Sequence, residues 1–156
     1  MPKLEEDWTF RENGGRFYNL DAGVGRTCLN LYFDVMLVQF YLRRLYDHPF
    51  GPAGKLFEEL KMDGYFGKIT EGYIRSFQES SGRYSAPLKQ DGMVHPARCE
   101  VFLISSYTIH RMQWMYHRLY QTESIYDREP GYSVYSPPAL RKHLGPPPID
   151  THGGGI

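Results

Sequence analysis

Apolar residues recur at helical spacing in the first third of the chain and predict a helix there. The pattern begins at Asn30 or Asp34 and runs to Tyr46. Its apolar positions form one stripe, which indicates a single inner face, and they are Val35, Val38, Leu42 and Leu45. We expect the helix to end at Asp47-His48-Pro49, because proline cannot continue it.

A second helical pattern follows the turn sequence Asp63-Gly64-Tyr65-Phe66-Gly67. Asp-Gly is a turn pair, and glycine tolerates the backbone conformations that turns require. Thr70 is the expected N-cap, and Glu71 places a negative charge in the first turn. The helix then runs to about Ser80, with an apolar face formed by Tyr73, Ile74 and Phe77 and ended by Gln78.

The turn sequence has a partial copy further along the chain. Asp91-Gly92-Met93-Val94-His95 repeats the order Asp, Gly, any residue, apolar residue, turn residue. Such repeats are typical of a small body built from related pieces. We therefore expect two turn-and-helix units, each with one buried residue in its turn, Phe66 in the first and Val94 in the second.

A third helical pattern runs without interruption from Ala97 to about Gln121, and Pro96 suits its first position. Its first half is apolar on more than one side, which predicts the central helix of a small bundle. Its second half carries a polar and aromatic face, formed by Tyr107, His110, Arg111, Trp114, His117, Arg118 and Gln121. Arg111, Trp114 and Arg118 on this face are candidates for an interface with a partner.

The two ends of the chain differ from the middle. Residues 1–23 hold aromatic side chains without a sustained period, and we expect an irregular arm. From Thr122 onward the chain is rich in Pro and Gly, with one or two helical turns expected within Ser136–Gly145. This composition is typical of a linker or a partner-binding strap. The predicted organisation is an aromatic arm (1–23), a mainly α domain (24–121) and a Pro/Gly strap (122–156).

Three motifs in this order resemble a known family. The first is Asn30, Asp34-Val35, Leu37-Val38-Gln39 and Leu42; the second runs from Asp63 through Gly67, Thr70-Glu71 and Phe77-Gln78; the third is Asp91-Gly92, Val94 and Pro96. Over about residues 24–105 the chain resembles the peptidoglycan-binding-like domain of bacterial wall-associated proteins. The resemblance implies a mainly α fold, a small orthogonal bundle of three helices, here with an extended last helix.

The chain also departs from that family. Where the family reads V-G-P-x-T at the second turn, this chain has Val94-His95-Pro96-Ala97-Arg98. The loop from Ser80 to Gln90 is longer than the usual link, and the last helix is predicted to run past the family's end. These differences affect the expected ligand more than the expected fold.

The resemblance implies a shallow ligand groove bordered by the helices and the first turn. Its rim would include Tyr65, Tyr73, the Ser80–Pro87 loop, His95 and Arg98. Tyrosine rings can stack on sugars, and Arg98 suits a peptide carboxylate. The remaining motif residues are expected to be scaffold, namely Asp63, Gly64, Phe66, Gly67, Thr70, Phe77, Gln78, Asp91, Gly92 and Val94.

Composition narrows the class of partner. The 18 basic and 18 acidic residues cancel, so no global field favours nucleic acid, although Arg111, Trp114 and Arg118 do interleave charge and aromatic rings. Aromatic residues reach 15%, which suits protein interfaces and surfaces that face sugars.

No pattern in the chain predicts catalysis, a metal or a cofactor. No Ser-His-Asp or Cys-His order stands near a nucleophile turn. His110 and His117 are too far apart on a helix, about 10 Å along the axis, to share a zinc ion. Neither Asp63 nor Asp91 begins a calcium loop. Cys28 and Cys99 imply no disulfide framework and are expected to behave as small buried apolar residues.

The sequence leaves the cellular location and two functions open. Met1–Asp7 lacks the apolar run of a secretory signal, and Leu29–Leu45 carries too many polar residues for a membrane span. We expect a cytoplasmic protein or one delivered to the cell envelope within a complex. One hypothesis is non-catalytic binding of peptidoglycan or a muropeptide. The other is a structural docking subunit of a larger bacterial or phage-derived assembly, such as a secretion or contractile injection machine, in which the fold contacts other proteins.

Overall fold

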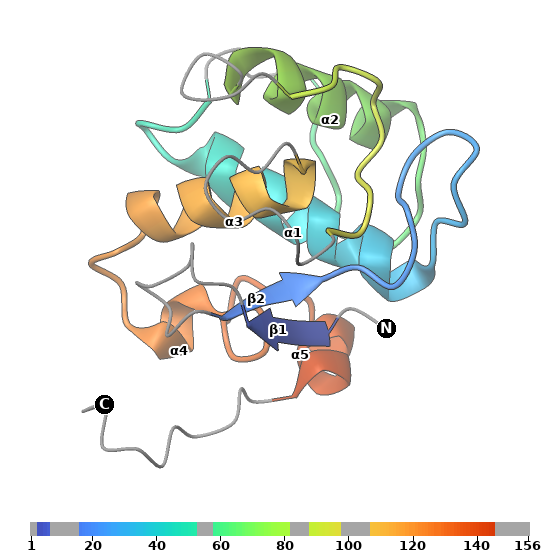
Figure 1. Ribbon diagram of the computed structural model, residues 1–156. Helices are drawn as coiled ribbons and strands as arrows, with labels where there is room; N and C mark the ends of the chain where they lie inside the picture. The colour runs from blue at the N-terminus through green and yellow to red at the C-terminus, as the bar shows by residue number, and fades with distance from the viewer. Residues whose placement is uncertain (1–2, 7–15, 53–57, 82–87, 98–106, 146–156) are drawn as a thin grey trace.

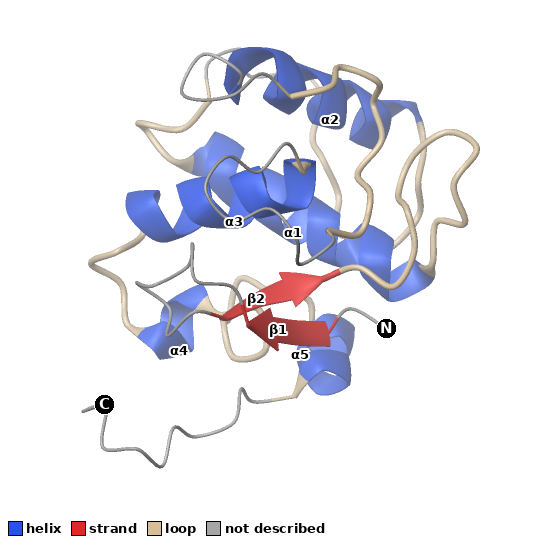
Figure 2. Cartoon of the chain, viewed as in Figure 1, coloured by secondary structure: helices blue, strands red, loops and turns tan. Residues whose placement is uncertain are grey.

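The computed structural model describes residues 3–6, 16–52, 58–81, 88–97 and 107–145. These residues form a mainly helical structure, as the sequence predicted (Figure 2). In chain order the elements are β1 (Lys3–Glu6), β2 (Arg16–Asn19), α1 (Tyr32–Asp47), α2 (Lys68–Ser81), α3 (Thr108–Leu119), α4 (Ile125–Arg128) and α5 (Pro138–Leu144).

Helix α1 is the centre of the structure. Helix α2 lies above it in Figure 1, α3 runs alongside, and the strand pair and α5 lie below. The predicted stripe of Val35, Val38, Leu42 and Leu45 is fully buried, as expected. The opposite sides of the helix are buried as well, among them Met36, Phe40 and Tyr41. Since α1 is buried on nearly every side, it takes the central place that the sequence assigned to the last helix.

The predicted starts of the other two long helices are wrong. Helix α2 begins at Lys68, so Thr70 is not its N-cap but lies inside its first turn. Helix α3 begins at Thr108, after an extended Tyr107. Ala97 is not helical because its N–H donates to Asn19 Oδ1 and its carbonyl accepts from Asn19 Nδ2, both at 2.9 Å. Residues 98–106, which the predicted helix also covered, lie outside the described part.

The N-terminal arm is not wholly irregular, contrary to the sequence expectation. Strands β1 and β2 pair antiparallel, from Lys3 opposite Asn19 to Glu6 opposite Arg16. Gln113 of α3 binds the end of β2, because its amide accepts from Tyr18 N at 2.7 Å and donates to Tyr18 O at 2.6 Å. The side chains of Tyr18 and Leu20 are buried in the core. The amide of α3 supplies the partner that β2 lacks on that side.

The first part of the C-terminal segment packs on α1. Arg44 of α1 lies between the rings of Tyr120 and Tyr135, with its guanidinium carbon 4.1 and 3.9 Å from their centroids. Its Nη2 is 2.8 Å from a carboxylate oxygen of Glu123. The predicted helical turns are confirmed as α5, which starts at Pro138 and ends at Leu144, capped by Gly145 with φ of 66°. Its Leu140 is fully buried, so the chain as far as Gly145 belongs to the folded body.

Two buried glutamines close the two Asp-Gly turns in the same way. Gln39 of α1 accepts the N–H of Gly64 at 2.8 Å and donates to Asp63 and Thr70. In the second turn, Gln78 of α2 occupies the equivalent position. It accepts the N–H of Gly92 at 2.9 Å and donates to the side chains of Asp91 and Thr108 at 3.4 and 3.1 Å.

The expectation of a buried apolar residue in each turn holds for one turn only. Val94 is fully buried and pairs with Val24 through two backbone hydrogen bonds of 2.8 and 2.9 Å. Phe66 is only half-buried, packed against the edge of the core. The glutamine of the preceding helix, not Phe66, fills the inside of the first turn.

Replacing Gln78 by Ala should lower the free energy of unfolding by about 2–4 kcal/mol, because the buried Gly92 N–H and its neighbours lose their partner. Chemical denaturation measures the change. Gln90→Ala, at an exposed glutamine on the same connection, is the matched control and should change stability by less than about 0.5 kcal/mol. Equal effects of the two substitutions would show that the amide does not close the turn.

Candidate functional site

The first Asp-Gly turn holds two tyrosines at the surface. Gly64 has φ of 77° and packs so closely under Tyr32 that an added Cβ would lie 2.5 Å from the ring. Asp63 Oδ1 accepts the N–H of Tyr65 at 3.0 Å, which fixes the backbone of the turn. The rings of Tyr32 and Tyr65 meet edge to face with centroids 5.8 Å apart. Tyr65 is 72% exposed and Tyr32 42%, so both offer ring surface to a ligand.

The second Asp-Gly turn lies against the loop that precedes α1. Gly25 packs on Met93, where an added Cβ would lie 2.7 Å from Cγ of that methionine. Asn30 holds this loop closed through its side chain, which accepts the N–H of Gly25 at 2.7 Å and donates to the carbonyls of Gly25 and Cys28. Cys28, expected to be buried, is half-buried, and Cys99 lies outside the described residues. The loop and the turn therefore form one fixed surface.

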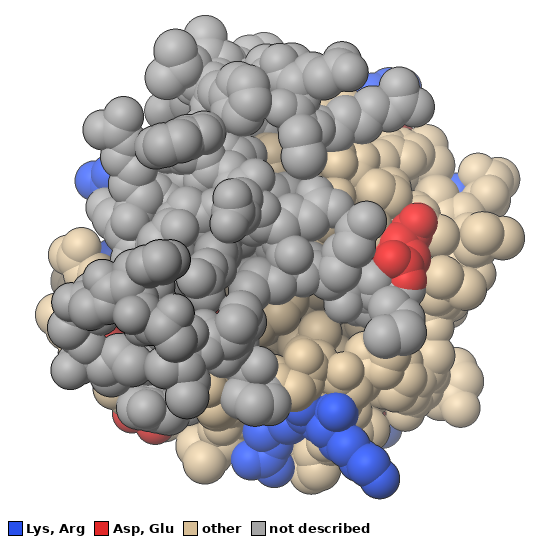
Figure 3. All heavy atoms as spheres, turned by 60° about the horizontal axis from the view of Figure 1, so that its bottom comes forward, with Lys and Arg blue, Asp and Glu red and all other residues tan. Residues whose placement is uncertain are grey.

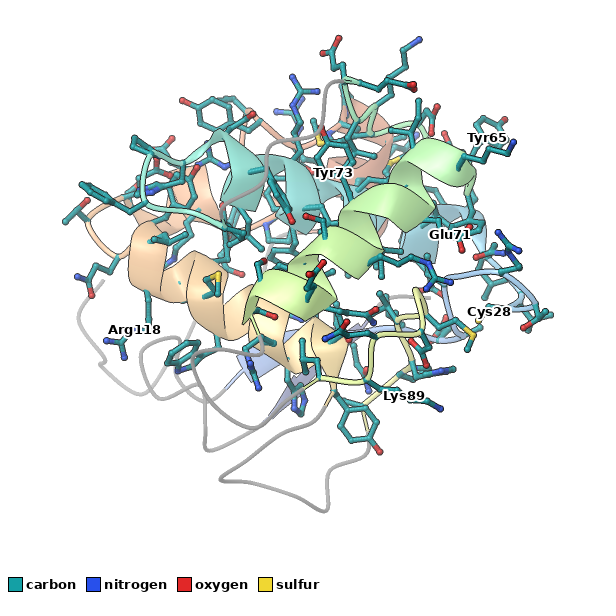
Figure 4. All side chains as sticks on the ribbon, turned by 90° about the horizontal axis from the view of Figure 1, so that it is seen from above. Cys28, Tyr65, Glu71, Tyr73, Lys89 and Arg118 are labelled. Carbon is teal, nitrogen blue, oxygen red and sulfur yellow. The ribbon has the colours of Figure 1, made fainter. Side chains whose placement is uncertain are left out.

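The structure separates the residues predicted to line the groove. Tyr65 and His95 are exposed, but they belong to different turns. Tyr73 lies between α1 and α2 (Figure 4) and is 5% exposed. Its ring packs on Tyr46 at 5.2 Å and its hydroxyl donates to Glu58 O, so its predicted place on the rim is wrong. Arg98 and most of the Ser80–Pro87 loop lie outside the described residues.

The polar and aromatic face predicted on the last helix is largely inside the protein. His110, Arg111 and His117 are buried, and Nη1 of Arg111 donates to the Ser81 carbonyl at the end of α2 at 2.8 Å. Arg111 is therefore a link between α3 and α2, not an exposed interface residue as predicted. Arg118 and Trp114 do lie together, with the guanidinium carbon 4.9 Å from the ring centroid. Most of the predicted polar face is not exposed, because α3 is buried on two sides.

Positive side chains occur in local groups on the surface. Figure 3 shows one face, on which the largest group of blue Lys and Arg side chains lies at the lower edge and smaller blue areas lie at other edges. Within the described ranges, no three His, Cys, Asp or Glu side chains gather as a metal site. Among the same residues, no helix has both the length and the apolarity to cross a bilayer.

One charged group was missed by the sequence analysis. Glu71, in the first turn of α2, contacts Arg26 and Arg75, each through an oxygen of its carboxylate at 3.2 Å. Hydrogen bonds from Arg26, and then from Arg75, lower the pKa of Glu71 despite the opposing effect of burial. Glu71 and Arg75 are four residues apart on a predicted helix, and this spacing could have predicted their ion pair. Nothing in the sequence placed Arg26 beside them, because it comes from a distant loop.

Comparison with family models, with curated proteins and with solved structures finds no match to this chain.

The pKa of His117 gives a test of how α3 is buried. Burial, and then the charge of Arg128, lower this pKa to about 3, whereas an unfolded chain binds the proton near pH 6.5. Below about pH 6.5 the unfolded state therefore takes up a proton that the folded state does not. Stability should fall between about pH 6.5 and 3, by up to about 1.4 kcal/mol per pH unit from this group.

His117→Gln should make this acid dependence shallower, measured by denaturant unfolding at several pH values. Parallel curves for the two proteins would contradict the burial of a neutral imidazole at this position.

Proposed function

We propose that this chain binds bacterial cell-wall peptidoglycan and does not react with it. The observation that carries the proposal is the pair of glutamine-closed turns. The residues that suggested the family, including Gln39 with Asp63 and Gln78 with Asp91, are the residues that contact one another. A fold does not by itself determine a ligand, so the surface residues must supply the recognition.

The Tyr32–Tyr65 pair is the surface best suited to a sugar. Its rings meet at 70°, so their faces point in different directions and each can cover a separate part of a glycan. Lys68, at the start of α2, is exposed beside this turn and can donate to sugar hydroxyls. An apolar ring with polar donors beside it is the usual composition of a small-ligand surface.

The charged residues near this surface favour binding over proton transfer. Glutamate is ionised at neutral pH, and hydrogen bonds from Arg26 and then from Arg75 lower the pKa of Glu71 further. A general acid at neutral pH needs a raised pKa. Glu71 is therefore suited to positioning the two arginines.

Sedimentation with purified sacculi tests the proposal. The wild-type chain should sediment with the sacculi, and Tyr65→Ala should bind about five- to tenfold more weakly, because an aromatic face contributes about 1 kcal/mol or more. Phe50→Ala is the matched control, since Phe50 is an exposed aromatic residue beyond the other end of α1 and should not affect binding. Wild-type protein that stays wholly in the supernatant would refute the proposal.

A second candidate function, docking in a larger protein assembly, is favoured by exposed aliphatic residues close in sequence to Tyr32 and Tyr65. Leu29 is 77% exposed, Leu31 42% and Ile69 39%. Such side chains cannot hydrogen-bond to sugar hydroxyls, whereas they commonly form the centre of a protein interface. On this view Tyr32 and Tyr65 contact a protein subunit.

Crosslinking in the native host, followed by purification of the chain, tests this second function. A partner in fixed proportion should be recovered with the wild type and lost with Leu29→Glu. Val134→Glu introduces the same charge at a residue that is also exposed, on the connection between α4 and α5, and should retain the partner. Recovery that Leu29→Glu does not alter would exclude docking through this surface.

A further inference from the structure

One buried carboxylate holds two exposed arginines in fixed positions. Oε2 of Glu71 is 3.2 Å from Nη2 of Arg26. Oε1 of Glu71 accepts from Nη2 and Nε of Arg75 at 3.2 and 3.3 Å. Each guanidinium is thus attached to a different oxygen of the same group, and the two arginines are brought side by side from a loop and a helix.

The acidic groups of this region lie deeper than the basic ones. The side chain of Glu71 is 10% exposed, whereas those of Arg26 and Arg75 are 74% and 51% exposed. The neighbouring ion pair is arranged in the same way, because the side chain of Lys89 is 84% exposed and that of Asp91 is 15% exposed. Glu71, Cys28 and Lys89 lie on the same side of the molecule in Figure 4. A ligand that approaches this side meets positive charge first.

The backbone under the arginines is hydrogen-bonded and lies close to them. Gly92 has φ of 72°, and an added Cβ would lie 2.9 Å from Nε of Arg75, so the guanidinium rests directly on the second Asp-Gly turn. Arg26 lies two residues after Val24, whose backbone pairs with Val94 of the same turn. The turn therefore fixes the positions from which both arginines extend. A site whose donors are positioned in advance loses less entropy when it binds a ligand.

The cluster of Arg26, Arg75 and Glu71 has a net positive charge. Two guanidinium groups share one carboxylate, which leaves one positive charge. Each guanidinium has five N–H donors in one plane, and the contacts to Glu71 use only part of them. Planar donors of this kind match a carboxylate, which two arginines can bind from both sides.

We infer that Arg26 and Arg75 form a subsite for a carboxylate-bearing peptide, with Glu71 as the positioning residue beneath them. The inference rests on the proposed wall binding and specifies the part of the polymer that is recognised, the peptide stem with its free carboxylates. Arg75 lies about 10 Å along α2 from its first residue, Lys68, at 1.5 Å per residue. The tyrosine pair at that end of the helix would then contact the glycan while the arginines contact the peptide.

Calorimetric titration of the full chain tests the subsite. The probes are a synthetic wall-stem tetrapeptide with free carboxylates and the same peptide with every carboxylate converted to a carboxamide. The acidic peptide should bind at least about tenfold more tightly than the amidated one, and high salt should weaken its binding. Arg26→Ala and Arg75→Ala should each reduce the affinity for the acidic peptide at least about tenfold.

Arg118→Ala is the matched control, because Arg118 is an exposed arginine on the far side of the molecule in Figure 4 and should leave binding unchanged. Arg26→Lys and Arg75→Lys keep the charge and should keep part of the affinity. Thermal melting of each variant verifies folding, and the lysine variants decide the result if an alanine variant is unfolded.

Three outcomes would overturn the inference: equal binding of the two peptides, equal binding by the arginine variants and the wild type, or tighter binding of inorganic phosphate than of the acidic peptide. Sacculi that bind the wild type and Arg75→Ala equally would overturn the subsite and leave the proposed wall binding intact. A wild-type chain that binds neither the sacculi nor the acidic peptide would overturn both the subsite and the proposed wall binding.

Discussion

Hydrogen bonds from buried side-chain amides to loop backbone are the interaction on which this structure depends. A small helical body with long connections has many backbone N–H and C=O groups that no helix or strand can satisfy, and leaving such groups buried and unpaired is costly. Gln39, Gln78 and Gln113, one on each long helix, each reach a loop or strand from a different part of the chain. Asn19 does the same for Ala97 from the end of β2. Each amide offers a donor and an acceptor, so it can replace a strand partner.

These amides also explain why α1 lies in the middle. Gln39 attaches the first turn to α1, and Gln78 attaches the second turn to α2, which packs on α1. On the opposite side, Arg44 of α1 is held between Tyr120, at the end of α3, and Tyr135 of the C-terminal segment. The polar residues of α1 thus bind segments that cover it, while its apolar residues form the core. A helix of this kind organises the fold from inside.

The same turns connect the scaffold to the surface proposed for binding. The first turn presents Tyr65 beside Tyr32, and the second supports Arg75 and the loop that carries Arg26. Because each turn is closed from within by a buried glutamine, the exposed residues rest on backbone that has little freedom to move. Rigid backbone under exposed aromatic and charged side chains suits recognition of an extended polymer, since little conformational entropy is lost when it binds.

The sequence by itself determined the local elements of this protein. Helical periodicity predicted α1 and α2 to within a few residues, Pro138 and Gly145 bounded α5, and the Asp-Gly pairs marked two turns in which glycine has positive φ. These features depend on neighbouring residues, which the sequence shows directly. Tyr65, which the resemblance placed on the rim of a groove, is exposed at the first of these turns.

Only the tertiary structure decided what each polar residue does. Arg111 and Tyr73 were expected at the surface and are buried, because segments distant in sequence cover them. Ala97 was expected to be helical and is not, and its backbone N–H and carbonyl are bound by Asn19. Arg26 joins Glu71 and Arg75 from a loop far away in the chain. Periodicity reports which side of an element is apolar, but long-range packing sets which polar groups find partners and which remain exposed.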